Sequence, residues 1–200
     1  MTINIKKKVF NIGFHKTGTT SLTHFMHELG YTSLHSVAQS MKLLNLGIQS
    51  ECAVDTGKPE NFQSLLNQQS LNDTIEMFDF FSDNPWPLIY EHLDKNYSES
   101  KFILTVRNTD RWIKSLLKHS GQEKTKMRQL IYGYGNPQNH IAQYRKTYIK
   151  HNKQVQKHFK NRDNLLVIDI EEDNTVLAKK VTQFLNIDNP DITFPTSNKR

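Results

Sequence analysis

Short apolar runs alternate along this chain with longer segments in which apolar residues recur at every third or fourth position. The first pattern is typical of buried strands, and the second of helices that bury one face. Because helical segments separate the strands, we expect an α/β protein with a central, mostly parallel sheet between two layers of helices. Strands are predicted at residues 9–14, 101–106 and 165–169, with a further short one at 75–81.

Capping residues set the expected boundaries of the helices. Thr19 or Thr20 can cap a first helix that Gly30 ends, and Asn108 or Thr109 can cap the helix that follows the strand at 101–106. No repeat or linker interrupts the pattern, so residues 1–200 are expected to form a single domain with a helical insertion. Further helices are predicted at residues 37–46, 61–71, 87–93, 124–132, 140–160 and 176–185.

Composition narrows the class of protein. Hydrophobic residues make up 36% and aromatic residues 10% of the 200 residues, which suits a packed core and not a disordered chain. No apolar run approaches the roughly 18 residues of a membrane span, and no secretory signal follows the charged N-terminus. The single cysteine, Cys52, excludes an internal disulfide framework and a cysteine-built metal site. We therefore expect a cytoplasmic protein without a membrane span.

The chain carries an excess of positive charge. Its 26 Lys and Arg residues outnumber 20 Asp and Glu residues, which gives a net charge of +6. Such an excess can attract nucleic acids, acidic membranes or phosphate-rich small ligands. No motif that reads nucleic acid is present, so we expect no nucleic-acid partner. The positions of the basic residues must decide between the other ligands.

A loop bounded by glycines joins the first strand to the first helix. It reads Gly-Phe-His-Lys-Thr-Gly-Thr-Thr-Ser from Gly13 to Ser21. After a strand and before a helix, such a loop can cradle a phosphate with backbone N–H groups and the positive end of the helix dipole. A kinase loop places its lysine directly after the second glycine, where this chain has Thr19, and the lysine here is Lys16 inside the loop. The pattern favours a phosphate site unlike that of an ATPase, with an ordinary strand-to-helix turn as the alternative.

A second basic residue follows another strand. Arg107 ends the strand at 101–106, at the edge where open α/β sheets bind their ligands. Ser115 lies eight residues further along, in the next helix. A guanidinium fork and a hydroxyl can share one phosphate. The alternative is that Arg107 pairs with Asp110 and that Ser115 is a residue of the helix surface.

Together these motifs resemble those of sulfotransferases that use 3′-phosphoadenosine 5′-phosphosulfate (PAPS). The segment 14–22 is similar to their 5′-phosphosulfate loop, and Arg107 with Ser115 is similar to their 3′-phosphate site. The resemblance is closest to small, mostly bacterial members, covers nearly the whole chain, and implies a P-loop-type three-layer α/β/α fold. Other matching features in the expected order are residues 83–87, 101–107 and 131–133, Trp112, Tyr148 with His151, and Phe194-Pro195 with Asn198.

The resemblance also implies roles for individual residues. Lys16 would face the charge that develops on the bridging oxygen of the donor, which makes it a catalytic residue. No metal is expected. The family usually has proline where this chain has His15, and Asp/Asn-Pro where it has Asn108-Thr109. The implied cofactor-binding residues are His15, Lys16, Thr17, Gly18, Thr19, Thr20 and Ser21 for the 5′-phosphate, Arg107 and Ser115 for the 3′-phosphate, and Asn198, Lys199 and Arg200 in place of a Gly-rich segment that closes over PAPS.

Sulfuryl transfer to a hydroxyl also needs a base within hydrogen-bond reach. Asp83 is the first candidate, because glycan sulfotransferases carry a catalytic Glu in a similar place upstream of the 3′-phosphate arginine. Its alternative role is to cap a helix that starts near Pro87. His35, His15 and His151 are rival bases, although His151 lies in the middle of a predicted helix and suits packing.

The sequence does not identify the sulfuryl acceptor. A small molecule, a lipid or a carbohydrate with a hydroxyl or amine would serve, and residues 31–81 and 121–139 are expected to form the walls of its pocket. Trp86 and Trp112 can line a pocket, but core packing is the simpler expectation for both. Two other functions compete with sulfuryl transfer: a P-loop nucleotide or nucleoside kinase, and a nucleotide-binding protein without catalytic activity.

Overall fold

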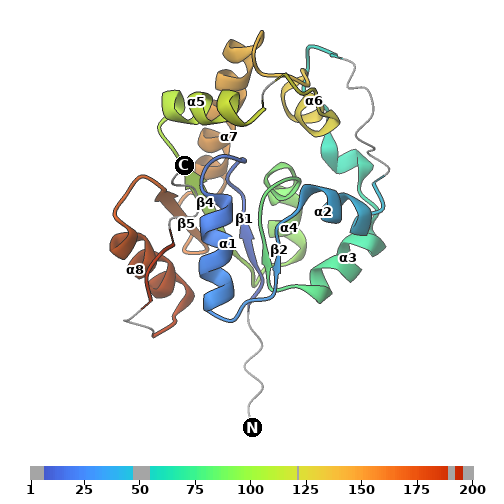
Figure 1. The fold of residues 1–200 in the computed structure, drawn as a ribbon. Helices are drawn as coiled ribbons and strands as arrows, with labels where there is room; N and C mark the ends of the chain where they lie inside the picture. The colour runs from blue at the N-terminus through green and yellow to red at the C-terminus, as the bar shows by residue number, and fades with distance from the viewer. Residues whose placement is uncertain (1–6, 47–54, 121, 189–191, 196–200) are drawn as a thin grey trace.

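The computed structural model describes residues 7–46, 55–120, 122–188 and 192–195. Within these residues a five-stranded sheet of order β2-β3-β1-β4-β5 forms the centre of the molecule (Figure 1). All neighbouring strands are parallel, which confirms the expected α/β class. The strands are β1 (Val9–Asn11), β2 (Ser33–Leu34), β3 (Phe80–Phe81), β4 (Lys101–Val106) and β5 (Leu165–Asp169).

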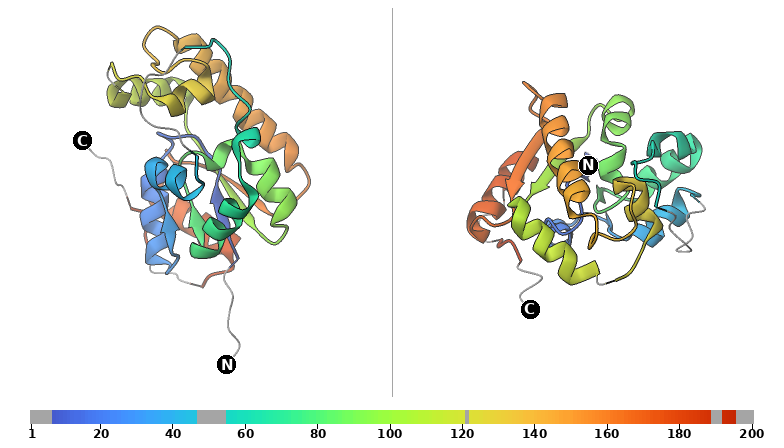
Figure 2. Two further views of the ribbon diagram at one scale, coloured as in Figure 1. Left: turned by 90° about the vertical axis from the view of Figure 1, so that its right-hand side faces the viewer. Right: turned by 90° about the horizontal axis from the view of Figure 1, so that it is seen from above.

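Helices cover both faces of the sheet because both faces of its central strands are apolar. Val9 and Ile103 point to the face covered by α1 and α8, while Phe10 and Phe102 point to the face covered by α4 and α7 (Figures 1 and 2). The helices are α1 (Thr19–Glu28), α2 (Val37–Leu43), α3 (Gln68–Met77), α4 (Tyr90–Asn96), α5 (Thr109–Ser120), α6 (Lys126–Tyr132), α7 (Ile141–His158) and α8 (Asn174–Leu185), with 3-10 turns η1 (Phe62–Leu65) and η2 (Trp86–Leu88).

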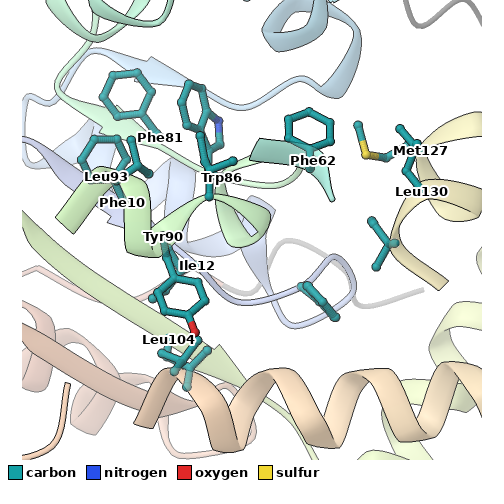
Figure 3. Packing of buried hydrophobic residues seen from close by; sticks show 14 of the residues in the cluster. Phe10, Ile12, Phe62, Phe81, Trp86, Tyr90, Leu93, Leu104, Met127 and Leu130 are labelled. Carbon is teal, nitrogen blue, oxygen red and sulfur yellow. The ribbon is translucent and has the colours of Figure 1, made fainter. Parts of the chain in front are cut away.

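Aromatic side chains dominate the larger core cluster. The ring of Phe10 stacks on those of Phe81 and Phe102, with centroids 4.9 and 5.6 Å apart, and Trp86 packs 4.7 Å from Phe81 (Figure 3). Trp86 and Trp112 are both fully buried, so the expectation of core packing is confirmed for both. Offset rings of this kind add about 0.5–1.5 kcal/mol per pair to the burial of their area.

The segment between β2 and β3 differs from its prediction. The helix expected at 61–71 is wrong, because a short 3-10 turn occupies Phe62–Leu65 and α3 begins only at Gln68. Asn67 starts α3 there by accepting the N–H of Ser70. The strand expected at 75–81 is reduced to Phe80–Phe81, because Ile75 belongs to α3. The apolar run therefore combines the end of a helix with a two-residue strand, and β2 was not predicted.

Gly13 lies just after β1, where the chain passes very close to Thr105 of β4. A Cβ at this position would sit 2.1 Å from the Thr105 hydroxyl and 2.3 Å from the Thr105 carbonyl oxygen. We expect Gly13→Ala to cost at least the roughly 1–3 kcal/mol of an overpacked core, measured as a lower urea midpoint. Adding Thr105→Ala should not restore the midpoint, because the backbone clash remains. A midpoint equal to that of the unmodified chain would contradict this contact.

Candidate active site

The loop between β1 and α1 lies at the carboxyl edge of the sheet, below α5 and α6 in Figure 1. Its backbone enters the left-handed region twice, at Lys16 (φ 66°) and at Gly18 (φ 80°). A residue with a side chain costs about 1–2 kcal/mol in this conformation. Loops built in this way turn successive N–H groups toward one point and form anion-binding nests. The two left-handed residues therefore give this loop a backbone that is compatible with the predicted phosphate site.

The N-terminus of α1 is open to an anion. The cap predicted at Thr19 or Thr20 is wrong: Gly18 occupies the N-cap position, and no side chain caps the helix. The first helical bond runs from Leu22 N–H to the Gly18 carbonyl, so the N–H groups of Thr19 and Thr20 have no partner within the helix. With no acidic residue in the first turn, the positive end of the dipole can hold a phosphate.

Side chains below the loop fasten it to the sheet. The buried Thr17 hydroxyl donates to the Phe14 carbonyl at 2.5 Å and lies 2.7 Å from the Thr105 hydroxyl. The Asn11 amide oxygen accepts from both Gly13 N–H and the Thr105 hydroxyl, each at 3.1 Å. The Thr17 side chain is thus turned into the protein, which leaves its backbone amide for any contact with a 5′-phosphate.

Lys16 interacts electrostatically with both Asp83 and Arg107 at this edge. Burial lowers the pKa of Lys16, while the Asp83 carboxylate raises it and the Arg107 guanidinium lowers it further. Burial raises the pKa of Asp83 above its ordinary value, against the opposing effects of Asn84 N–H, His35 and Lys16. Both shifts bring the pKa values of these groups closer to neutral pH. Groups with such pKa values are the most effective acid and base catalysts.

Asp83 does not cap the helix predicted from Pro87. Its Oδ1 accepts the N–H of the adjacent Asn84 at 2.8 Å, and the two helices that follow have Pro85 and Ile89 at their N-cap positions. Asp83 itself adopts a left-handed conformation with φ 68°. Residues with side chains in this region are concentrated at functional sites, which favours the alternative role of Asp83 as a base.

Two of the rival histidines have different environments. His151 donates Nε2–H to the Ile12 carbonyl at 2.7 Å and stacks on Phe14 with centroids 4.1 Å apart. Burial lowers its pKa to about 4, so His151 is a packing residue that supports β1 and the loop. His35 lies beside the site, with Nε2 3.3 Å from the Thr20 hydroxyl. Burial lowers the pKa of His35 and the Asp83 carboxylate raises it.

His15 belongs to the loop between β1 and α1, but its ring is directed into the protein. Its Nδ1 lies 3.1 Å from the Asn84 side-chain amide, and its Nε2 lies 3.4 Å from the Tyr132 hydroxyl. Burial, together with Arg128 and Lys16, lowers the pKa of His15 to about 3. His15 is therefore neutral at physiological pH. Its ring contacts protein groups, whereas the sequence predicted that His15 is one of the residues that bind the 5′-phosphate.

Arg107 is held in place by its backbone and by one side-chain nitrogen. The Tyr148 hydroxyl accepts the Arg107 N–H and donates to the Arg107 carbonyl, each at 2.9 Å. Arg107 Nε donates to Glu171 at 3.0 Å, so the predicted alternative pairing with Asp110 is wrong. Asp110 pairs with Arg145 instead. Within the described part of the chain, no hydrogen bond or ion pair involves the two terminal nitrogens of Arg107. Both nitrogens can therefore bind an anion.

Ser115 lies on α5, the helix that follows Arg107, and its side chain is half-buried. Asn108 caps this helix as predicted, accepting the N–H groups of Asp110 and Arg111. The remaining predicted cofactor residues, Asn198, Lys199 and Arg200, lie outside the described residues.

Sequence reasoning missed two titratable neighbours of the site. Glu171 follows β5, accepts a hydrogen bond from Arg107 and forms an ion pair with Arg111. His119 lies four residues after Ser115 on α5, and its pKa is lowered by burial, Lys16 and Arg128 and raised by Asp83. Residues four apart share one face of a helix. The spacing of Ser115 and His119 was therefore a signal that the sequence already contained.

A cavity of about 410 Å³ lies behind the loop, between η2, α6 and α7. Its lining includes Phe14 and His151, together with Pro59, Gln63 and Ile131 from the two regions expected to wall an acceptor pocket. Neither Lys16 nor Asp83 lines it. The cavity thus touches the loop at Phe14 but does not include the candidate reaction centre.

None of the His, Cys, Asp and Glu side chains of the described residues form a group of three or more that could hold a metal ion. No described helix has both the length and the apolar character that crossing a membrane would require.

Comparisons with known proteins agree with this geometry. The family model described as a sulfotransferase domain matches residues 8–141 and 125–200. The Ava biosynthesis cluster protein M of Aspergillus versicolor is 31% identical over 111 residues, which cover 54% of this chain and 41% of that protein. The chain thus spans less than half the length of this curated relative.

A solved structure shares the fold at low sequence identity. A sulfotransferase from Alicyclobacillus acidocaldarius superposes with a TM-score of 0.60 and 17% identity, over 97% of this chain and 86% of that chain. Mouse sulfotransferase SULT7A1, solved in complex with PAP, gives a TM-score of 0.49 and 15% identity, over 93% of this chain and 59% of that chain. The family match covers nearly all described residues, and the chain therefore belongs to the sulfotransferase domain family.

Proposed function

We propose that this chain transfers a sulfuryl group from PAPS to a hydroxyl or amine of a small-molecule, lipid or carbohydrate acceptor. The observation that carries the proposal is the open N-terminus of α1 next to Lys16, with Asp83 and Arg107 within electrostatic reach of that lysine. Family membership supports the same reaction. The proposal includes residues 1–200 acting as one domain in the cytoplasm, which the single cysteine favours.

The residues present suit a donor with two separate phosphate groups. The backbone N–H groups from Gly18 to Thr20 would hold the 5′-phosphate, because the glycine N-cap adds no side chain there. The free nitrogens of Arg107, with the Ser115 hydroxyl, would hold the 3′-phosphate. Glu171 keeps the Arg107 fork oriented by binding its Nε. When bound, PAPS supplies an activated sulfuryl group on its 5′-phosphate.

In the proposed transfer, one S–O bond to the donor breaks and one S–O or S–N bond to the acceptor forms. Lys16 stabilises the negative charge that develops on the bridging oxygen as it leaves with the 5′-phosphate. Asp83 accepts the proton that the acceptor loses, since its raised pKa makes it a stronger base than an ordinary carboxylate. His35 lies beside Asp83 and can share this proton. The protein thus supplies charge stabilisation and a base without a lysine at the kinase position.

Calorimetric titration with 3′,5′-adenosine bisphosphate (PAP), the desulfated donor, tests the proposal. We expect binding in the absence of magnesium, because Lys16, Arg107 and the N-terminus of α1 provide the positive charge themselves. Binding of magnesium-ATP without binding of PAP would contradict the proposal and favour a kinase. Binding of PAP without transfer of label from PAPS to any acceptor would favour a nucleotide-binding protein.

The same titration distinguishes a specific 3′-phosphate contact from general positive charge. We expect Arg107→Ala to weaken PAP binding about 10- to 100-fold, as loss of a charged hydrogen-bonding partner does. Arg111→Ala is the matched control, because Arg111 contacts the same Glu171 but is 67% exposed. If both variants weaken binding equally, net charge and not the Arg107 fork holds the nucleotide.

A further inference from the structure

We propose that His15 is a positioning residue that fixes Lys16 relative to Asp83. This inference rests on the proposed function for its catalytic consequence, while the contact itself can be tested separately. His15 directly precedes Lys16, and Asn84 directly follows Asp83. The hydrogen bond between the His15 ring and the Asn84 side chain therefore joins two segments one residue away from each reacting group.

Three contacts hold His15 from three directions. As placed, the Asn84 amide donates to Nδ1 at 3.1 Å, which leaves Nε2–H to meet the Tyr132 hydroxyl of α6 at 3.4 Å. The His15 carbonyl accepts the indole N–H of Trp112 from α5 at 2.9 Å. His15 thus connects the phosphate loop with the segment that carries Asp83 and with the two helices above the loop.

The backbone near this contact needs such support. Lys16 and Asp83 both adopt the left-handed conformation, with φ 66° and 68°. Residues with side chains persist in this region only where their surroundings hold them. Asn84 is only 3% exposed, so removing the His15 ring would leave its amide without a partner in a dry environment. Both left-handed residues would then be free to relax and move apart.

His15 performs this task without exchanging a proton. Both of its ring nitrogens face protein groups, and its pKa of about 3, lowered by burial, Arg128 and Lys16, keeps the ring neutral. A neutral ring adds no charge next to Lys16. The same ring would therefore be a poor general base, and its contribution must be sought in geometry.

The contact is tested first by stability, independently of any activity. Thermal midpoints are compared for His15→Ala, Asn84→Ala and the double variant. Because each single change removes the same hydrogen bond, we expect the double variant to lose clearly less than the sum of the two single losses. Additive losses would overturn the proposed contact, even if the chain proved to be no sulfotransferase.

The catalytic consequence is tested by two substitutions, each of which preserves one hydrogen-bonding position of the His15 ring. The amide of His15→Asn can occupy the place of Nδ1 and accept from Asn84, whereas that of His15→Gln reaches toward Tyr132. We expect kcat to fall about 10- to 100-fold in His15→Gln, as it does when reacting groups are misplaced by about 1 Å, and only a few-fold in His15→Asn. The KM for PAPS and the affinity for PAP should change little in both.

The pH profile separates positioning from proton transfer. We expect both variants to keep the pH dependence of kcat/KM of the unmodified enzyme. Loss of the acidic limb in both would identify His15 as the base and overturn the proposal, as would equal kcat values in the Asn and Gln variants. If the unmodified chain neither binds PAP nor transfers sulfuryl groups, the proposed function fails, and the stability cycle still decides the contact.

Discussion

Lys16→Met is expected to lower kcat for sulfuryl transfer about 10²- to 10³-fold, the usual effect of removing one donor aimed at a developing oxyanion. Methionine is an unbranched apolar side chain of nearly the length of the lysine stem, so the loop retains its packing while the charge is lost. PAP affinity should fall less than kcat, because PAP lacks the sulfuryl group and the charge that develops on transfer. The measurement is single-turnover transfer from labelled PAPS, together with PAP titration of the same variant.

Stability provides a check that the Lys16 variant is folded. Burial lowers the pKa of Lys16 in the folded chain, so the charged form is disfavoured by folding below the pKa of an unfolded lysine. Lys16→Met should therefore be no less stable than the unmodified chain near neutral pH. Lys118→Met, which removes an exposed lysine of α5, is the control for net charge. Full activity in Lys16→Met would refute the proposed role of this lysine.

Asp83→Asn is expected to reduce kcat/KM about 10²- to 10⁴-fold, the range found for loss of a general base. Amide and carboxylate have nearly the same shape, so the amide oxygen of this variant could still accept from the adjacent backbone N–H. The matched control is Asp73→Asn on α3, because Asp73 is exposed and is not among the groups that shift the pKa of Lys16. Equal activity of the two variants would remove Asp83 from the mechanism and leave His35 as the candidate base.

The raised pKa of Asp83 predicts how the activity of the unmodified chain depends on pH. Burial raises the pKa of Asp83, while Asn84 N–H, His35, Lys16 and His119 act against that shift. The base is active when deprotonated, so activity should rise with pH through this raised pKa, at a higher pH than an ordinary aspartate would give. Asp83→Asn should lose that limb.

The same raised pKa predicts the effect on folding. A carboxyl whose folded pKa exceeds its unfolded pKa stabilises the fold only in its protonated form, and this contribution disappears as the pH rises through the folded pKa. Asp83→Asn should therefore raise Tm at neutral pH, and the gain should shrink toward and below the ordinary aspartate pKa of 3.8. A lower Tm at neutral pH would mean that the pairing of Asp83 with Lys16 and His35 outweighs its burial.

Strands with strong local patterns were predictable from the sequence. The β4 and β5 boundaries agree with prediction at Lys101–Val106 and Leu165–Asp169, because these runs are apolar, rich in β-branched residues and bounded by polar ones. The two-residue strand β2 was not predicted, and the strand predicted at 75–81 contains β3 without giving its boundaries. Both strands exist because β1 and its neighbours offer backbone partners, which no local pattern records.

The candidate site likewise has features that the sequence predicts and contacts that it does not. The loop with Lys16 and the arginine at the end of β4 follow from the order of residues, because a strand, a glycine-bounded loop and a helix place them at one edge of a parallel sheet. The pairing of Arg107 with Glu171, and not with Asp110, depends on the neighbouring strand β5. Side chains 64 residues apart meet there, and local spacing contains no information on such contacts.

The sequence by itself determined the α/β class and predicted the phosphate loop with Lys16 and Arg107, since each depends on residue types at short spacing. Only the tertiary structure decided what His15, Thr17 and Asp83 do. Thr17 and His15 turn into the protein, and Asp83 caps no helix and stays within electrostatic reach of the lysine. The reason is physical: burial and partners from distant segments set the direction and the pKa of a polar side chain, and both arise only when the chain is folded.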